Sequence, residues 1–359
     1  TLLRDGGKAL YVIPTYKECG IGVSVSVPVS ACKKFGWDEL LNDDHTKIWS
    51  LDEFTPYLEQ AAEDGSYEVL YNFDNNEVVN GSREYYMLDK IAAINNFIGI
   101  DLSVEGATEA TLVPDIPSYQ EYVALMNSWN EAGYIHENFA TGQATSELDR
   151  LFVAEALTPD QQNYVNSRKE LNKDGQGVVY VRMTDTYLNS TSSLGSGMSF
   201  ASYTPDIDAC LKFMDALYGN TEFADLCLYG IEGVNYTRTD DGRVEKIADS
   251  GYDFGTWSCA NVMTVSLTTT DSLDKKEKYA KFNEEAKPSY ILGFVFDTEP
   301  VAAEVIACNA VVAEHQKLLE NGFMGEDGLA AYREALVSAG AEKVLEEVNR
   351  QLAEFFAAK

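Results

Sequence analysis

Side chains that could hold a small polar ligand occur in four stretches of the chain. In the first, Tyr16, Lys17 and Glu18 directly follow a short apolar run that ends at Pro14. A flat ring beside polar groups suits a sugar, because sugar C–H faces stack on rings and sugar hydroxyls need hydrogen-bond partners. The alternative for these residues is an ordinary exposed turn.

The second stretch is an aromatic residue in a glycine- and serine-rich surrounding. Trp257 follows Gly-Thr, and Asn261 comes shortly after it with an amide that could bond to hydroxyl groups. Stacking on a ligand and packing in the interior are equally open roles for Trp257.

Two further stretches contain candidate ligand contacts. Tyr85 either faces a ligand or, with Tyr86, opens the apolar stripe of a helix predicted up to Phe97. Ser196 and Ser199 lie in a segment rich in Ser, Thr and Gly. Small residues there either admit a ligand to the backbone or allow close packing.

Catalytic and metal sites have little support in the sequence. The three histidines, at positions 45, 136 and 315, are too scattered for a zinc site or a Ser-His-Asp triad. Among 58 acidic residues, chance alone supplies pairs at the separation that a glycosidase needs. Residues 74–77 offer oxygen ligands without the glycine of an EF-hand, which leaves calcium open. We therefore name no catalytic residue, no metal ligand and no cofactor from the residues themselves.

Six cysteines are spread along the chain without a CxxC pair. Most stand beside apolar residues, as in Ala-Cys210-Leu. Buried free thiols are the preferred interpretation.

Composition bounds the class of protein. The 359 residues are 45% hydrophobic, which predicts a globular protein of about two domains. The net charge of −31 disfavours nucleic acids and anionic lipid surfaces as partners. No apolar run reaches the roughly 18–20 residues that span a bilayer, and the first residues do not resemble a secretory signal.

The elements that must position the candidates alternate between strands and helices, which predicts the α/β class. Ser50 and Glu53 have the spacing of a capping box, and Arg182 is expected to pair with Asp185 in a structural ion pair. Asp-Asp-Gly at 240–242 predicts a hairpin turn. We expect strands at 9–13, 21–28, 69–73, 177–182 and 290–296, and helices at 50–63, 117–129, 205–228, 300–321, 329–339 and 342–358.

Several aromatic residues are expected to pack rather than bind. Trp129, Phe213 and Tyr218 lie on helical stripes and are predicted in the core. Trp37 and Trp49 flank a polar loop, where packing at the surface is favoured over contact with a ligand.

Four stretches together resemble one known family. They are Gly6–Pro14, Leu125–Ile135, the pair Cys210–Tyr218 and Leu228–Arg238, and Gly293–Val301. In this order they are similar to extracellular solute-binding proteins of bacterial ABC importers. The similarity is to carbohydrate-type (family 1-like) lipoproteins with a Tyr-Gly-Ile-Glu-Gly C-terminal region.

The resemblance implies a type II periplasmic-binding-protein-like fold with two lobes, a hinge and a ligand in the interlobe cleft. It implies a carbohydrate, of oligosaccharide size, as ligand and a membrane permease as partner. It also implies no catalysis, and a position outside the cell membrane, held there by lipid, or in the periplasm of a Gram-negative cell. A monomer is the default expectation. The alternatives are a binding protein for a peptide or other small polar ligand, a carbohydrate-active hydrolase, and a surface adhesion module.

The resemblance also predicts how the lobes divide the chain. Residues 1–20 end lobe 1, 21–28 form a hinge strand, and 29–190 form lobe 2. Residues 191–240 return to lobe 1, and the mostly helical region 241–359 is shared between lobes. Because few residues precede Ile13, the first lobe is expected to be incomplete in this chain.

Overall fold

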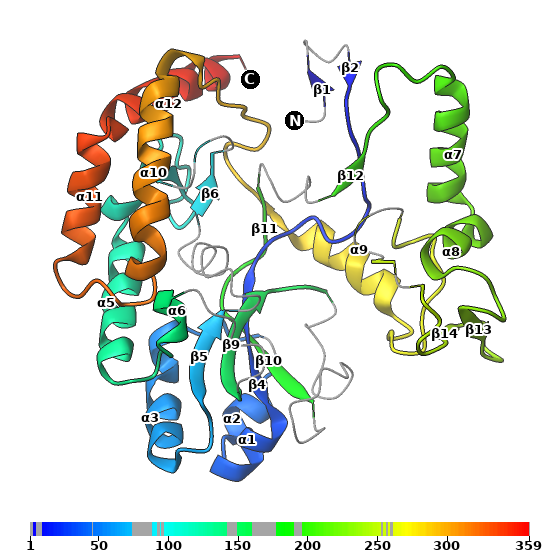
Figure 1. Cartoon of the computed structure of the whole chain (residues 1–359), viewed down its shortest axis with the longest axis horizontal. Coiled ribbons are helices and arrows are strands. Elements are labelled where there is room, and N and C mark those ends of the chain that lie inside the picture. The colour runs from blue at the N-terminus through cyan, green and yellow to red at the C-terminus, as the bar shows by residue number, and fades with distance from the viewer. Residues whose placement is uncertain are drawn as a thin grey trace. The chain divides into compact units, whose positions relative to one another are not determined.

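The computed structural model divides the chain into two compact units (Figure 1). Unit 1 contains residues 1–20 and 191–286, and unit 2 contains residues 21–190 and 287–359. The structure describes residues 3–4, 9–44, 46–73, 88–91, 94, 97–141, 149–159, 177–189, 196–252, 254–255, 258 and 261–358.

A four-stranded mixed sheet lies at the centre of unit 2. Its order is β10 (Val178–Arg182), β4 (Val23–Pro28), β9 (Arg150–Ala156) and β5 (Val69–Phe73). β4 runs antiparallel to both of its neighbours, and β5 runs parallel to β9. All six residues of β4 are buried, including its two serines. Both faces of this strand are therefore covered, and its alternation of Val and Ser does not separate a buried face from a solvent-exposed one.

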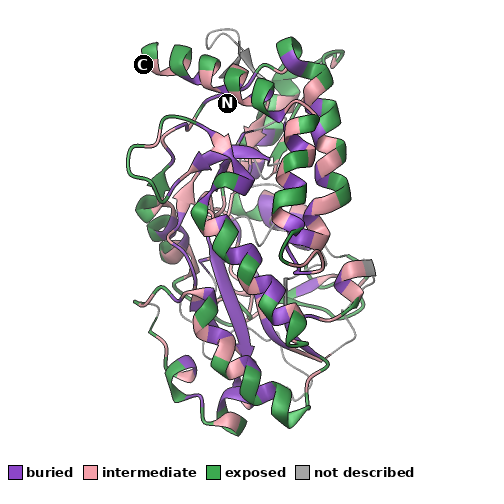
Figure 2. Ribbon diagram, turned by 90° about the vertical axis from the view of Figure 1, so that its left-hand side faces the viewer, coloured by how far each residue is buried: buried purple, intermediate pink, exposed green. Residues whose placement is uncertain are grey.

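Helices surround this sheet and follow the predicted periodicity closely. Proline at the first position of α5 loses no helical hydrogen bond, and the helix ends before Gly133, whose φ is +79°. In α12, Val344, Val348 and Leu352 form the buried stripe, and Figure 2 shows buried and exposed positions alternating along the helices. The helices of unit 2 are α1 (Val29–Phe35), α2 (Asp38–Leu41), η1 (Leu51–Phe54), α3 (Thr55–Asp64), η3 (Val113–Asp115), α5 (Pro117–Glu131), α6 (Asn138–Thr141), η5 (Glu299–Val301), α10 (Ala302–Leu319), α11 (Gly328–Ser338) and α12 (Ala341–Ala357).

Two predicted elements of unit 2 are wrong. The expected helix up to Phe97 overlaps β6 (Leu88–Lys90), which pairs with β7 (Ile98–Asp101), and β7 pairs with β8 (Thr111–Leu112). The expected strand 290–296 is a turn and an extended segment that joins no ladder. In the first case the pairing of β6 with β7 overrode the local pattern; in the second the apolar run found no strand partner among the described residues.

The tryptophans near the polar loop are buried, so the prediction of surface packing was wrong for both. Trp37 stacks on Phe152 of β9, with ring centroids 5.6 Å apart. The Trp49 main-chain N–H donates to the Arg182 carbonyl at 2.8 Å, and Trp49 is 2% exposed. The loop folds against the end of β10 and carries both rings into the core. Trp129 is 1% exposed, as predicted.

Unit 1 is built from short strand pairs and three helices. Its core contains Met214, Leu217, Ala224, Leu228, Tyr229, Tyr236, Val244 and Val265. Its elements are β1 (Leu3–Arg4) with β2 (Ala9–Leu10), β3 (Ile13–Pro14) with β12 (Gly197–Met198), β13 (Tyr236–Arg238) with β14 (Val244–Lys246), and the helices α7 (Ile207–Gly219), α8 (Thr221–Tyr229) and α9 (Lys275–Glu285). The hairpin predicted at 240–242 is confirmed as the turn between β13 and β14.

Phe213 was expected in the core but is 42% exposed. The face of α7 that meets the core carries Met214 and Leu217. Phe213 lies beside that face and contacts Phe223 of α8 edge to face, at 5.4 Å. Tyr218 is half-buried and donates its hydroxyl to the Pro14 carbonyl at 2.7 Å.

Candidate functional site

The first candidate surface is the turn around Tyr16 in unit 1. Main-chain bonds hold it on two sides: the Thr15 N–H donates to the Ser196 carbonyl at 3.1 Å, and the Val262 N–H donates to the Tyr16 carbonyl at 2.9 Å. Tyr16 also forms an isolated parallel β-bridge with Asn261. The fold therefore brings two predicted residues distant in sequence, Ser196 and Asn261, to the turn that contains Tyr16.

The charged residues of this turn neutralise each other. Lys17 Nζ lies 2.6 Å from Glu18 Oε1, and both side chains are mostly buried. Asn283 of α9 clamps the main chain here, accepting from the Cys19 N–H at 2.7 Å and donating to the Lys17 carbonyl at 2.8 Å. The result is a rigid turn without net charge that presents the Tyr16 ring, which is 42% exposed. Asn283 was missed because no local signal ties it to a segment far away in sequence.

The amide of Asn261 is already engaged by the protein. Its Nδ2 donates to the Tyr218 carbonyl at 3.2 Å, and its Oδ1 accepts from the Met263 N–H at 2.9 Å. These bonds fix the loop that pairs with Tyr16. Asn261 therefore holds the turn in place.

The small residues of the return segment lie against the chain itself. Ser199 Oγ donates to the Tyr11 carbonyl at 2.9 Å. A Cβ added at Gly197 would lie 2.9 Å from the Ile13 carbonyl oxygen, so only glycine fits this strand pair. Tyr85 and Trp257, the remaining predicted residues, lie outside the described residues.

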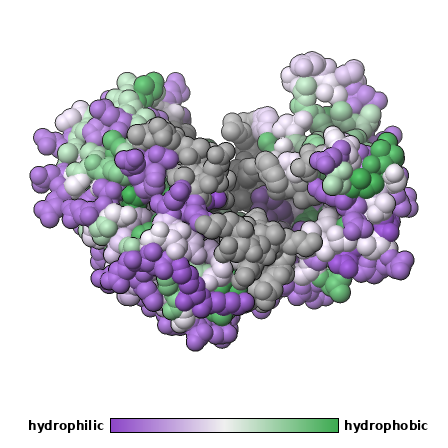
Figure 3. Space-filling model, turned by 60° about the horizontal axis from the view of Figure 1, so that its bottom comes forward, coloured by the Kyte–Doolittle hydropathy of each residue, from purple (hydrophilic) through white to green (hydrophobic). Residues whose placement is uncertain are grey.

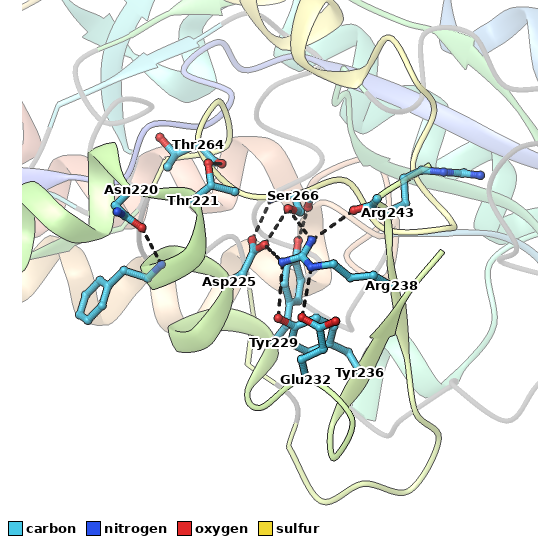
Figure 4. Close-up of polar contacts among 12 residues, drawn as sticks. Asn220, Thr221, Asp225, Tyr229, Glu232, Tyr236, Arg238, Arg243, Thr264 and Ser266 are labelled. Carbon is cyan, nitrogen blue, oxygen red and sulfur yellow. Dashed lines mark hydrogen bonds and ion pairs between the residues drawn. The ribbon is translucent and has the colours of Figure 1, made fainter. Parts of the chain in front are cut away.

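The Tyr-Gly-Ile-Glu-Gly stretch, residues 229–233, adjoins a polar network in unit 1 that is centred on Asp225 (Figure 4). The carboxylate of Asp225 is fully buried and accepts from Arg238 Nη2 at 2.7 Å and from the Ser266 N–H at 2.9 Å. The hydrogen bond to Asp225 raises the pKa of the Arg238 guanidinium. This pair ties α8 to the β13–β14 hairpin.

Glycine is required within this stretch by geometry. Gly230 has φ +87°, and a Cβ there would lie 2.5 Å from Oδ1 of Asn235. That oxygen accepts from the Ile231 N–H at 2.9 Å and so fixes the turn after α8. The stretch therefore builds the framework of unit 1.

The second candidate surface is a groove of about 790 Å³ in unit 2, which the sequence did not indicate. Three segments distant in sequence form it: the loop 48–52, the first three turns of α5, and residues 183–185 after β10. Its described lining is Ile48, Trp49, Ser50, Asp52, Ser118, Glu121, Tyr122, Ala124, Leu125, Ser128, Met183, Thr184 and Asp185. Its volume is in the range of sites for small molecules.

Three stretches of unit 2 meet where the chain passes between the units. Ile21 and Tyr187 exchange both main-chain hydrogen bonds, at 2.7 and 2.8 Å. β11 (Tyr187–Leu188) pairs in parallel with β15 (Lys287–Pro288). Asp185 lies 2.9 Å from Arg182 Nη2, which confirms the predicted ion pair, and it also binds Lys287 and raises the pKa of that ammonium.

Neither a metal site nor a membrane span is found in the part of the chain that the structure describes. No group of three or more His, Cys, Asp or Glu side chains is placed to hold a metal ion among those residues. Within the same residues, no helix is both long enough and apolar enough to cross a bilayer.

Comparison with known proteins then relates this architecture to a class. A model described as "Domain of unknown function (DUF3502)" matches residues 290–357. A carbohydrate ABC transporter substrate-binding protein of Streptococcus pneumoniae is 24% identical over 383 residues, spanning 99% of this chain and 74% of that protein.

Solved structures show the same architecture. The N-glycan transport solute-binding protein NgtS of Streptococcus pneumoniae superposes with a TM-score of 0.80 at 20% identity, over 96% of this chain and 75% of NgtS. Its complex with Man5GlcNAc gives a TM-score of 0.75 at 21% identity, over 98% and 76%. The chain has the fold of a type II solute-binding protein. The resemblance to solute-binding proteins of ABC transporters seen in the sequence is thereby confirmed.

Proposed function

We propose that this solute-binding protein is the substrate-binding component of an ABC importer, capturing a carbohydrate and delivering it to a membrane permease. The observation that carries the proposal is the match of 99% of the chain to a carbohydrate ABC transporter substrate-binding protein. NgtS, which shares the fold, was crystallised with Man5GlcNAc.

The chemistry of unit 1 supports a neutral ligand of this kind. The turn around Tyr16 offers an exposed ring on a rigid backbone, and the Lys17–Glu18 pair cancels its own charge. Rings of this kind stack on the apolar faces of sugars, while binding through charge would need an unpaired group. Tyr85, Ser196, Ser199, Trp257 and Asn261 remain further candidates near the ligand.

In this role the protein binds without chemical turnover. It acts outside the cell membrane as a monomer, anchored there by lipid, and the permease is its protein partner. The division of the chain into lobes at residues 20, 28, 190 and 240 also remains a prediction.

Calorimetry and thermal unfolding with a panel of oligosaccharides and peptides test the proposal. A ligand present at 100 times its Kd adds about 2.7 kcal/mol of stability. We expect at least one oligosaccharide to raise the melting temperature and to be recovered intact by chromatography. Stabilisation by peptides alone, or hydrolysis of the sugar, would contradict the proposal.

A matched pair of variants tests the turn around Tyr16. Tyr16→Ala is expected to weaken binding of that oligosaccharide about fivefold, because a ring contact contributes about 1 kcal/mol. Tyr203→Ala is the control, since Tyr203 is an 87% exposed tyrosine of the same unit. Equal affinities of the two variants would remove Tyr16 from the site.

A further inference from the structure

The groove of unit 2 has a firm floor. Trp49, Tyr122 and Met183 are at most 4% exposed. The Tyr122 hydroxyl donates to the Glu320 carbonyl at 2.9 Å, and the Trp49 indole N–H donates to Asp43 at 3.0 Å. These bonds hold the floor without any ligand, so the groove is formed in advance of binding.

The rim of the groove carries hydrogen-bond acceptors and negative charge. Asp52 and Glu121 are exposed there, and neither forms an ion pair with any residue that the structure describes. Asp185 adds acceptor oxygens, but its charge is neutralised by Arg182 and Lys287. The described lining contains no Lys, Arg or His.

The Lys and Arg side chains close to the groove already form ion pairs with carboxylates of the protein. Lys47 lies over the Trp49 ring at 3.4 Å, and its Nζ is 3.0 Å from Glu39 and from Glu53. Arg182 and Lys287 are both paired with Asp185. No described cation near the groove is therefore free to receive an anionic group.

One hydroxyl of the lining has no partner. Ser118 Oγ is buried and forms no hydrogen bond with the described part of the chain. A buried hydroxyl without a partner is costly, and a ligand hydroxyl that bonds to it in the groove would relieve that cost. Ser118 can both donate to and accept from such a group.

The geometry points to this groove as a carbohydrate-binding surface of unit 2 that admits neutral and amino sugars and excludes anionic ones. The inference rests on the proposed function and adds to it the charge class of the ligand. Sugar hydroxyls and amines donate to the acceptors of the rim, whereas a uronate or sialate would face Asp52 and Glu121 at close range. Two like charges about 4 Å apart repel each other even in water, so two carboxylates weaken binding of an anionic sugar about tenfold or more.

Calorimetry with a desialylated N-glycan and its sialylated counterpart tests this inference. Wild-type protein is expected to bind the neutral glycan at least tenfold more tightly. The double variant D52N/E121Q is expected to reduce that ratio to about threefold or less. The control is E334Q/E346Q, which removes the same charge from exposed positions of α11 and α12 and should keep the wild-type ratio.

Hydrogen exchange shows where on the protein the glycan binds. Binding of the neutral glycan should protect residues 118–128 and 183–185. A ratio near one in the wild type, an equal fall of the ratio in both double variants, or absence of protection in these segments would overturn the inference while leaving carbohydrate binding intact. If neither glycan and no other sugar binds, the proposed function itself fails.

Discussion

The two units differ in how they bury apolar surface. Unit 2 has an extensive core of packed aromatic rings: Trp37 and Trp49 are in stacked pairs, and Trp129 meets Tyr71 edge to face. Unit 1 has a core of eight residues, yet it carries most of the exposed large hydrophobic side chains of the described chain. Several of them, such as Ile207, Leu211 and Leu226, lie on α7 and α8, and Figure 3 shows hydrophobic residues on the surface there.

This difference indicates that separate interactions stabilise each unit. Burial of aromatic rings dominates in unit 2, because each ring removes a large apolar area from water. In unit 1 the buried pair of Asp225 and Arg238 connects α8 to a hairpin that few apolar contacts hold. We therefore expect unit 2 to respond most to loss of volume and unit 1 to loss of polar partners.

The largest effect is expected from a core aromatic of unit 2. Trp129→Ala removes a ring that meets Tyr71 at 4.9 Å and an N–H that donates to Thr55 at 3.0 Å. It should lower the free energy of unfolding of unit 2 by about 3–5 kcal/mol. Urea unfolding monitored by amide exchange in each unit measures it. Phe213→Ala on α7 is the matched change in unit 1 and should have a small effect, and equal losses would contradict the contrast.

Breaking the buried ion pair should destabilise unit 1 strongly. Arg238→Ala leaves the Asp225 carboxylate buried without its cation, which costs about 2–3 kcal/mol for a partner that is itself partly exposed. The same exchange experiment should show faster exchange in α8 and the β13–β14 hairpin. Arg243→Ala breaks the exposed pair with Asp241 and one long hydrogen bond, of 3.5 Å, to the Thr269 carbonyl, and should have a far smaller effect. Similar effects of the two variants would show that the buried pair is dispensable.

Alkaline pH should destabilise unit 2 through its buried thiols. Burial raises the pKa of Cys32 from 9.0 to about 12. Below pH 9 both states keep the proton, whereas between pH 9 and 12 only the unfolded state loses it, so stability falls as pH rises. From pH 8 to 10 this thiol alone lowers stability by about 1.4 kcal/mol. Cys32→Ala should therefore show a smaller loss over this range in urea unfolding, and an unchanged loss would refute the assignment.

The smallest effects are expected from the loss of helix caps. These effects should be of similar size in the two units. Asn220 Oδ1 accepts from the Phe223 N–H at 2.9 Å in unit 1, and Ser50 and Glu53 form a capping box in unit 2. Asn220→Ala and Ser50→Ala should each cost about 1 kcal/mol in urea unfolding. Asn220→Ser should regain most of the loss, and failure to do so would separate the cap from other roles of Asn220.

Features that depend on neighbours a few residues apart could be predicted from the sequence. The capping box at Ser50, the stripe of α5, the C-terminal helices and the hairpin at 240–242 are confirmed. The Arg182–Asp185 pair belongs to the same group, because three residues separate its members. In each case the spacing along the chain sets the geometry.

Features that depend on distant segments could not be predicted. The burial of Trp49 follows from its bond to Arg182, and the pairing of β6 with β7 replaced the expected helix up to Phe97. Asn283 reaches the turn at Lys17 from more than 260 residues away, and no pattern near either residue signals this. The candidate surface around Tyr16 was recognised by residue type, and its rigidity came from such a distant contact.

The sequence by itself determined the α/β class, the acidic character, most helices and the resemblance to solute-binding proteins. The first three follow from composition, periodicity and short spacings, which act within a turn or two of chain, whereas the resemblance rests on four matching stretches of sequence. The tertiary structure alone decided which side chains are engaged by the protein itself and which remain accessible to a ligand. It engaged the amide of Asn261, buried Trp37 and Trp49, and built an acid-rimmed groove from segments distant in sequence. Such surfaces form only when the chain folds, because their neighbours are set by packing rather than by order along the chain.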